Sequence, residues 1–354
     1  MKRFLCMLCC GMLLSVCALA ENELYAQTGT LPVYRAVTRS SKAMPLYDQV
    51  QPEWFNQSGE PSYKNWSRRD RYDHYRFPDG GELNIAAEGI DYREYDGTME
   101  TIPLESDAPV ETLDKPTLKC SIGELAMGAR QCWPKLDSQP QLEQTRLGRL
   151  TLEDAQTRME TLLAQIGLTG YQCVYALDMS VERIYDLGEK FRKGLDSSNV
   201  PLPAFETATE KDEGFYLYYE KFLDGVSLEH ERQDAGQFSA CAYITAEGLH
   251  LFHLRDSHVI GDVYETPDRL LTADEARAAF EKGNPKRQRD GFQNAQAVSL
   301  TLTYRPIRAP KKKDGVVLSP AWLIEYTFSD GGQNDGYAWY SATDGHLIAD
   351  CYSR

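Results

Sequence analysis

The chain has 354 residues, of which 42% are hydrophobic and 26% charged, with a mean hydropathy of -0.50. These proportions are typical of a folded globular protein and exclude a disordered chain. The 38 Lys and Arg side chains against 53 Asp and Glu give a formal net charge of -15. This charge repels a phosphate backbone or an anionic lipid surface, so we expect no nucleic-acid partner.

The first residues have the pattern of a secretory signal peptide. Lys2 and Arg3 precede an apolar run at 4–16, and Ala18 and Ala20 are small residues at the positions that a signal peptidase reads. The run has about 13 residues, fewer than the roughly 20 that a membrane-spanning helix needs. We therefore expect a signal peptide at 1–20 that is cleaved after Ala20, and an extracellular mature protein.

Cys17 gives the same segment a second interpretation. It follows Leu14-Ser15-Val16, where a bacterial lipoprotein would carry its lipid on the cysteine. Val16 stands where such signals usually have Gly, Ala or Ser. In this alternative the mature protein is a membrane-anchored lipoprotein, and it contacts the membrane only through its N-terminal lipid.

The cysteines beyond the signal segment are few and odd in number. Of the nine in the chain, four fall in the first twenty residues. An oxidising compartment then allows at most two disulfides with one thiol left over, in pairings that the sequence leaves open. Cys173 and Cys241 lie in apolar strand patterns, which favours buried, inert thiols. The five are Cys120, Cys132, Cys173, Cys241 and Cys351.

The N-terminal part is expected to be rich in strands. Residues 21–68 have no steady periodicity and predict an extended, partly ordered leader. Within the next segment, 69–148, the stretch 71–94 alternates polar and apolar residues across Gly-bearing turns, which predicts a three-strand meander. A Pro-, Asp- and Thr-rich connection and a short helix at 121–131 follow.

A helix-and-strands pattern follows at 149–265. Thr151 is placed to cap a helix over 152–166, which Gly167 ends. Its apolar residues recur on one face. We expect strands at 171–178, 215–219, 240–245 and 249–254.

The same order recurs about 121 residues later, at 266–354. Thr272 and Glu275 form a capping box, and the helix is expected to run to about Lys282 and to end at Gly283. Strands are expected at 297–305, 322–328, 337–340 and 346–351. The predicted fold class is α+β: two tandem units, each one amphipathic helix packed on a sheet of three or four antiparallel strands, preceded by a strand-rich N-terminal segment.

The last unit resembles a PepSY-type domain. The resemblance rests on the Thr-capped helix, on Trp322 and Tyr326 in one strand, and on the closing hairpin at 340–348. Over 149–354 the pair of units is also similar to the extracytoplasmic YycH and YycI regulators of Gram-positive sensor kinases. The sequence departs from the PepSY pattern at Ser341, where Asn or Asp is usual, and at Asp344, where Thr is usual. It departs from the YycH and YycI proteins in having a cleavable-looking signal in place of their N-terminal membrane helix. The resemblance implies a non-enzymatic role, in which such domains inhibit a peptidase or modulate a membrane partner.

His250, His253 and His258 are close in sequence and raise the question of a metal site. On a regular strand, residues 250 and 253 point to opposite faces, so they cannot share one ion without a bulge. We therefore expect no metal. No phosphate loop, dinucleotide motif or known catalytic motif is present, so we expect no cofactor and no catalytic residue.

Two basic segments stand out against the negative charge of the chain. Each is expected to be a loop beside the strand at 297–305, and together they are candidate contacts for an acidic partner or an anionic cell-wall polymer. The alternative is a pair of solvated loops. The residues are Lys286, Arg287, Arg289, Lys311, Lys312 and Lys313.

The aromatic strand at 215–219 carries rings on both faces. This predicts a central, buried strand, with an aromatic ligand groove as the alternative. The function that the sequence favours is a secreted or surface-tethered binding or regulatory protein without catalysis. An extracellular hydrolase with a site that spacing does not reveal, or a structural surface protein, are the alternatives.

Overall fold

The structure is a computed structural model that describes residues 31–40, 55, 62–67, 72–78, 80–102, 111–132, 141–194, 204–228, 238–289, 295–309, 315–328 and 335–352. The expected signal peptide and Cys17 lie outside these residues. None of the helices described has the length and apolar character needed to cross a membrane.

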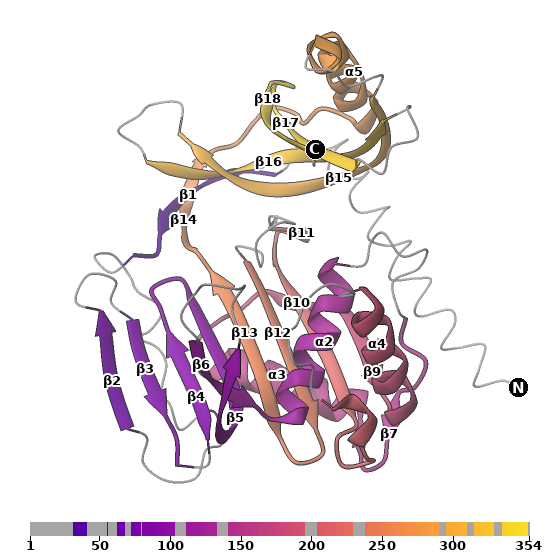
Figure 1. Cartoon of the computed structure of the whole chain (residues 1–354). Helices are drawn as coiled ribbons and strands as arrows, with labels where there is room; N and C mark the ends of the chain where they lie inside the picture. Colours follow the sequence, from indigo (N-terminus) through magenta and orange to yellow (C-terminus); the bar gives the residue numbers. More distant parts are fainter. Residues whose placement is uncertain are drawn as a thin grey trace, which may run out of the picture. The chain divides into compact units, whose positions relative to one another are not determined.

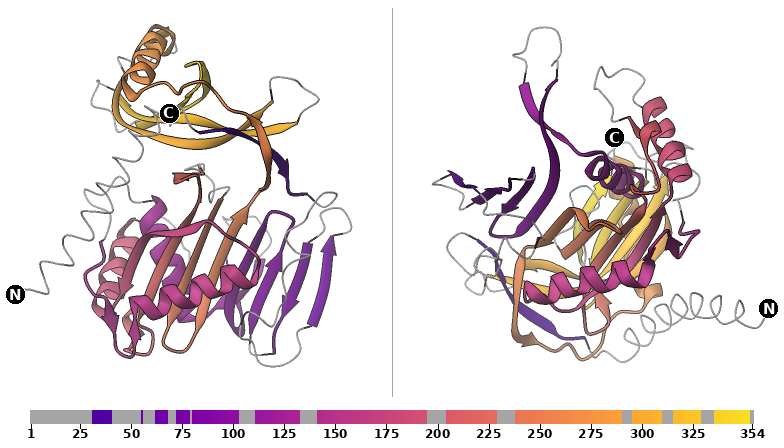
Figure 2. Two further views of the ribbon diagram at one scale, coloured as in Figure 1. Left: turned by 180° about the vertical axis from the view of Figure 1, so that it is seen from behind. Right: turned by 90° about the horizontal axis from the view of Figure 1, so that it is seen from below.

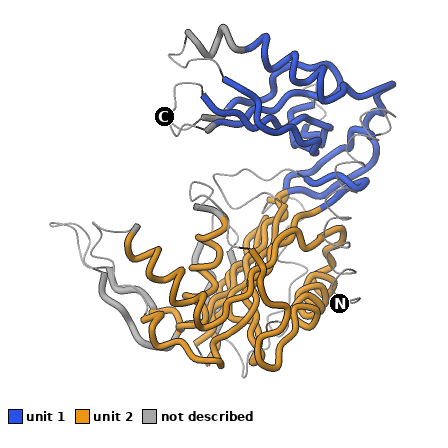
Figure 3. Tube along the Cα trace, turned by 90° about the vertical axis from the view of Figure 1, so that its right-hand side faces the viewer, with its two compact units in different colours: residues 1–38, 222–229, 258–354 blue, residues 39–221, 230–257 orange. Residues whose placement is uncertain are grey.

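The chain folds into two compact units, shown in Figure 3. Unit 1 contains residues 1–38, 222–229 and 258–354, and unit 2 contains residues 39–221 and 230–257. In unit 2 the strands are β2 (Ser62–Ser67), β3 (Tyr72–Arg76), β4 (Gly81–Ile85), β5 (Gly89–Ile102), β6 (Glu111–Pro116), β7 (Arg146–Leu147), β8 (Leu150–Thr151), β9 (Tyr171–Met179), β10 (Gly214–Leu223), β12 (Phe238–Thr245) and β13 (Leu249–Asp256). Its helices are α2 (Leu118–Cys132), α3 (Leu152–Gln165), α4 (Val181–Gly194) and the 3-10 turn η3 (Phe205–Thr207).

A ten-stranded antiparallel sheet is the centre of unit 2. Its order is β11-β10-β12-β13-β5-β4-β3-β2, with β9 also paired to β10 and β6 to β5. The two-residue strand β11 (Val226–Ser227) and the end of β10 belong to unit 1. Helix α3 lies across one face of the sheet, and α2 and α4 lie on the other (Figures 1 and 2).

Strand β10 is buried on both faces, as its aromatic pattern predicted. Phe215, Leu217 and Tyr219 point to the core under α3, whereas Tyr216 and Tyr218 join the core with α2 and α4. All five side chains are at most 3% exposed. The strand is therefore core, and the alternative of an open aromatic groove on it is wrong.

Unit 1 is built around a six-stranded antiparallel sheet. Its strands are β1 (Val33–Thr38), β14 (His258–Glu265), β15 (Ala295–Arg308), β16 (Val316–Phe328), β17 (Asp335–Ser341) and β18 (Leu347–Tyr352). The order is β14-β1-β16-β17-β18, and β15 also pairs with β16. Helix α5 (Ala273–Arg289) packs Phe280 against the rings of Tyr326 and Tyr340.

The expected α+β class, with two tandem units of one helix on a three- or four-stranded sheet, is wrong. The fold is mostly β, with large antiparallel sheets. The meander does not form a separate N-terminal segment, because β5 pairs with β13 and so extends the sheet of unit 2 by several strands. Likewise β1, from the expected leader, pairs with both β14 and β16. In each case unpaired backbone groups of an edge strand gain partners from a segment that is distant in sequence.

The start of α3 follows the sequence prediction. Thr151 is the N-cap, and its hydroxyl accepts a hydrogen bond from the Asp154 backbone N–H at 3.0 Å, while the Asp154 carboxylate accepts from the Thr151 backbone N–H. Gly167, with φ of 81°, follows the helix in the left-handed conformation that favours glycine. The helix is thus fixed at both ends by local chemistry.

Helix α5 starts as expected and ends later. Thr272 and Glu275 form the capping box, but the helix runs to Arg289 instead of ending at Gly283. A glycine inside a helix costs only about 1 kcal/mol relative to alanine, which is not enough to end it here. Lys286, Arg287 and Arg289 therefore belong to a helix, so the expected loop at this point is wrong.

Candidate functional site

A cleft of about 510 Å³ opens in unit 2 between helix α3 and the β12–β13 hairpin. This volume lies in the range of small-molecule sites. The wall from α3 consists of Thr157, Arg158, Met159, Thr161, Leu162 and Gln165, and the wall from the hairpin of Ile244, Ala246, Glu247, Gly248 and Leu249.

The amphipathic character of α3 gives the cleft an apolar floor and a polar rim. Met159 and Leu162 are buried against the sheet. Thr157, Thr161 and Gln165 follow one another at four-residue spacing, which places them along one exposed side of the helix. A ligand here would meet aliphatic groups below and hydroxyl and amide groups beside it.

The hairpin wall is a tight turn tied to α3. Thr245 and Gly248 exchange backbone hydrogen bonds: the Thr245 nitrogen lies 2.9 Å from the Gly248 oxygen, and the Gly248 nitrogen lies 3.3 Å from the Thr245 oxygen. The Arg158 guanidinium donates a hydrogen bond from Nη1 to the carbonyl oxygen of Thr245 at 3.0 Å. This bond joins the two walls directly.

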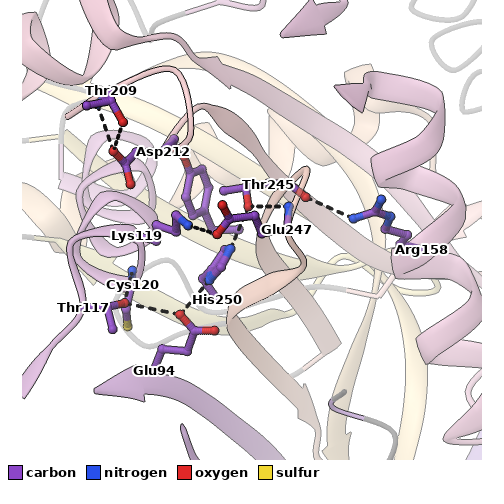
Figure 4. A network of polar contacts seen from close by, with 11 residues as sticks. Glu94, Thr117, Lys119, Cys120, Arg158, Thr209, Asp212, Thr245, Glu247 and His250 are labelled. Atoms are coloured by element: carbon purple, nitrogen blue, oxygen red, sulfur yellow. Dashed lines mark hydrogen bonds and ion pairs between the residues drawn. The ribbon is translucent and has the colours of Figure 1, made fainter. Parts of the chain in front are cut away.

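A buried polar network braces the hairpin from behind (Figure 4). His250 lies between two partners: Nδ1 is 2.7 Å from Glu94 Oε2, and Nε2 is 2.7 Å from Thr245 Oγ1. Because a carboxylate only accepts hydrogen bonds, Nδ1 is the donor in the contact with Glu94. Thr117, just before α2, donates its hydroxyl to the same carboxylate oxygen at 3.4 Å. The network links β12, β13, β5 and the start of α2.

The order Thr245, His250, Glu94 is also that of a nucleophile, a base and an orienting carboxylate. A nucleophile must reach its substrate, however, and Thr245 is 0% exposed and does not line the cleft. Its hydroxyl is further occupied by a hydrogen bond from the Glu247 backbone N–H at 3.1 Å. We therefore assign the network a structural role, in which it positions the hairpin.

Lys119 of α2 binds the carboxylate of Glu247 at the hairpin tip. The hydrogen bond and the charge of Lys119 lower the pKa of Glu247 below its ordinary value. Glu247 is consequently ionised at neutral pH. In Figure 4 its side chain is directed toward Lys119, whereas Arg158 reaches Thr245 from the other side.

The histidines do not form a metal site in the part of the chain that the structure describes. The expected opposite orientation of His250 and His253 is nevertheless wrong. The ladder between β12 and β13 shifts register between Tyr243 and Ile244, so His250 is an extra residue of a β-bulge. Its ring lies 6.4 Å from that of Tyr243, which packs in the core under α2, and His253, opposite Cys241 of the same core, points to this face too.

Among the cysteines whose side chains the structure describes, Cys120, Cys173 and Cys241 are free thiols. Burial raises the pKa of Cys120 to about 12 and that of Cys241 to about 11, and it also raises the pKa of Cys173. These groups stay protonated at neutral pH and are poor nucleophiles. The side chains of Cys132 and Cys351 lie outside the described residues.

The structure does not place the side chains of the candidate residues that the sequence singled out relative to this cleft. The side chains of Lys286, Arg287 and Arg289 and the whole of Lys311, Lys312 and Lys313 lie outside the described residues, as does Cys17. Sequence reasoning missed Arg158, because a single arginine on the polar side of an amphipathic helix has no signal that separates it from a solvated residue.

Comparisons with known proteins add information on the fold. No protein-family model matches the chain, and a search of curated proteins found no match. The chain is similar to the crystal structure of an uncharacterized protein from Eubacterium rectale ATCC 33656, with a TM-score of 0.53 and 11% sequence identity. The match covers 91% of this chain and 86% of the other chain. At this identity the similarity shows a shared fold.

Proposed function

We propose that this chain is a secreted or surface-tethered binding protein that acts without catalysis, and that the α3–hairpin cleft is its ligand site. The observation that carries the proposal is the cleft itself, with its apolar floor, its polar rim and one guanidinium. Its hairpin wall is held by Arg158 on one side and by His250 on the other. Such a braced site loses little conformational entropy when a ligand binds.

The location of the protein is a separate part of the proposal. A mature chain that begins at Glu21 is expected from cleavage after Ala20, and mass spectrometry of the protein isolated from its own cells measures this directly. A mature N-terminus at Cys17 that carries the added mass of a lipid would show that the protein is tethered to the membrane instead of released. An N-terminus that still contains residues 1–16 would contradict both versions.

Filling the cleft is expected to abolish binding. Thr161 is exposed and lines the cleft, so the indole ring of a Thr161→Trp variant would occupy the space of the ligand without disturbing the core. Ala164→Trp is the matched control, because Ala164 is exposed on the same helix and does not line the cleft. The probes are a panel of N-acetylated amino acids and their amides. Their binding is detected by NMR, as changes in the chemical shifts of the backbone amides of the mature chain.

Saturable shift changes in α3 and at 244–249, lost in Thr161→Trp and kept in Ala164→Trp, are the expected result. Shift changes elsewhere in the molecule, or equal binding by the two tryptophan variants, would contradict the assignment of the site. The PepSY-type resemblance implies a peptidase or a membrane sensor as the partner, and this remains a prediction.

A further inference from the structure

The charge inside the cleft narrows the class of ligand. Arg158 and Glu247 are the charged residues among its lining residues. The Glu247 carboxylate is paired with Lys119 of α2 and is directed away from Arg158 (Figure 4). Of these two groups, the Glu247 carboxylate is compensated by Lys119, so the guanidinium of Arg158 is the stronger attraction for a charged ligand.

Arg158 has hydrogen-bonding capacity left for a ligand. A guanidinium carries five N–H donors, and one donor of Arg158 is bonded to the Thr245 carbonyl oxygen. Within the described ranges no ion pair engages this side chain, and the Asp154 carboxylate one turn earlier on α3 interacts with its charge without a direct contact. The bond to Thr245 restrains the guanidinium, and a guanidinium has the planar fork of donors that matches a carboxylate.

The rest of the cleft suits an amino-acid residue. Leu249 is partly buried, and Met159, Leu162 and Ile244 are at most 6% exposed. Together they give the cleft a small aliphatic floor that favours an apolar side chain. The hydroxyl of Thr157 and the amide of Gln165 can hydrogen-bond the N–H and C=O of a peptide unit. A simple acyl chain would leave these polar groups unused.

We propose that the cleft binds the C-terminal residue of a peptide, with its free carboxylate on Arg158 and its apolar side chain on the aliphatic floor. This inference rests on the proposed function, since it names the ligand class of the same site. Because Arg158 is exposed at the rim, its pair with the carboxylate is worth about 1 kcal/mol, which corresponds to a fivefold difference in affinity.

The test compares N-acetyl-L-leucine, which has the carboxylate, with N-acetyl-L-leucinamide, which lacks it. Both are titrated into the mature protein and into Arg158→Gln, Arg158→Lys and the control Arg192→Gln, whose arginine is exposed on α4 and paired with Glu189 and Glu206. We expect the wild type and Arg192→Gln to bind the acid about fivefold more tightly than the amide. The preference should disappear in Arg158→Gln and return in part in Arg158→Lys.

The outcomes separate the two proposals. Equal affinities of the wild type for acid and amide would overturn the carboxylate inference and leave the cleft as a binding site. Binding of neither probe at millimolar concentration would overturn the proposed function as well. If Arg158→Gln does not fold, the comparison of the two probes on the wild type and on Arg158→Lys still decides.

Discussion

A Lys221→Met variant is expected to lose about 3 kcal/mol of stability in unit 2. Lys221 Nζ lies 2.9 Å from the carboxylate of Asp256, which is 0% exposed. The second cation near this carboxylate, Arg39, is farther away, with Nε at 3.7 Å. Removing Lys221 would leave the buried carboxylate with Arg39 and the Tyr171 hydroxyl as its partners. Methionine has a similar length but also loses the contacts of the ammonium group with the rings of Tyr171 and Phe238.

Lys190→Met is the matched control for this prediction. Lys190 forms an ion pair with Asp186 on the surface of α4, where both side chains are more than half exposed. Pairs of this kind contribute about 0.5 kcal/mol. Hydrogen exchange of the backbone amides in β12 and β13 measures the loss of stability in unit 2. If Lys221→Met loses no more stability than Lys190→Met, the burial of Asp256 does not depend on Lys221.

A His250→Ala variant is expected to lose about 2–3 kcal/mol of stability in unit 2. The ring hydrogen-bonds both the Glu94 carboxylate and the Thr245 hydroxyl. Alanine would leave the fully buried threonine hydroxyl and the carboxylate, which is 25% exposed, without this partner. Because His250 braces the hairpin wall of the cleft, the affinity for N-acetyl-L-leucine should fall in the same variant. Urea-induced unfolding and the probe titration measure the two effects.

His346→Ala provides the comparison for His250. His346 also lies 2.6 Å from a carboxylate oxygen, that of Asp344, but both side chains are more than half exposed, so a change within about 0.5 kcal/mol is expected. A similar loss of stability in the two variants would mean that the burial of the His250 network does not increase its contribution to stability. Unchanged probe binding in His250→Ala would remove its role in bracing the cleft.

Local chemistry made several elements predictable from the sequence. The cap at Thr151, the glycine at 167 and the apolar periodicity between them define α3 closely. The run at 215–219, which has four aromatic residues and Leu217, likewise identified β10 as a buried strand. In both cases the determinants lie within a few residues of each other.

The pairing of distant strands was not predictable in this way. Ile90 of β5 lies opposite Leu254 of β13, and Tyr34 of β1 opposite Leu318 of β16. An alternating pattern indicates that a strand has a buried face, but it does not indicate which edge of which sheet the strand joins. The predicted α+β class failed for this reason, since it assigned these strands to a separate N-terminal segment.

The cleft was hidden for a related reason. Its two walls, α3 and the turn at 246–248, are far apart in the sequence, and each is unremarkable by itself. The bulge at His250 adds a second obstacle, because one extra residue reverses the face that strand alternation predicts. A single sequence gives no signal for either feature.

A crystal structure of the protein with N-acetyl-L-leucine at saturating concentration tests the central claim most directly. The account predicts the ligand between α3 and the β12–β13 hairpin, with its carboxylate within hydrogen-bonding distance of Arg158 and its side chain against Leu162 and Leu249. An empty cleft beside a ligand bound elsewhere on the molecule would contradict the account.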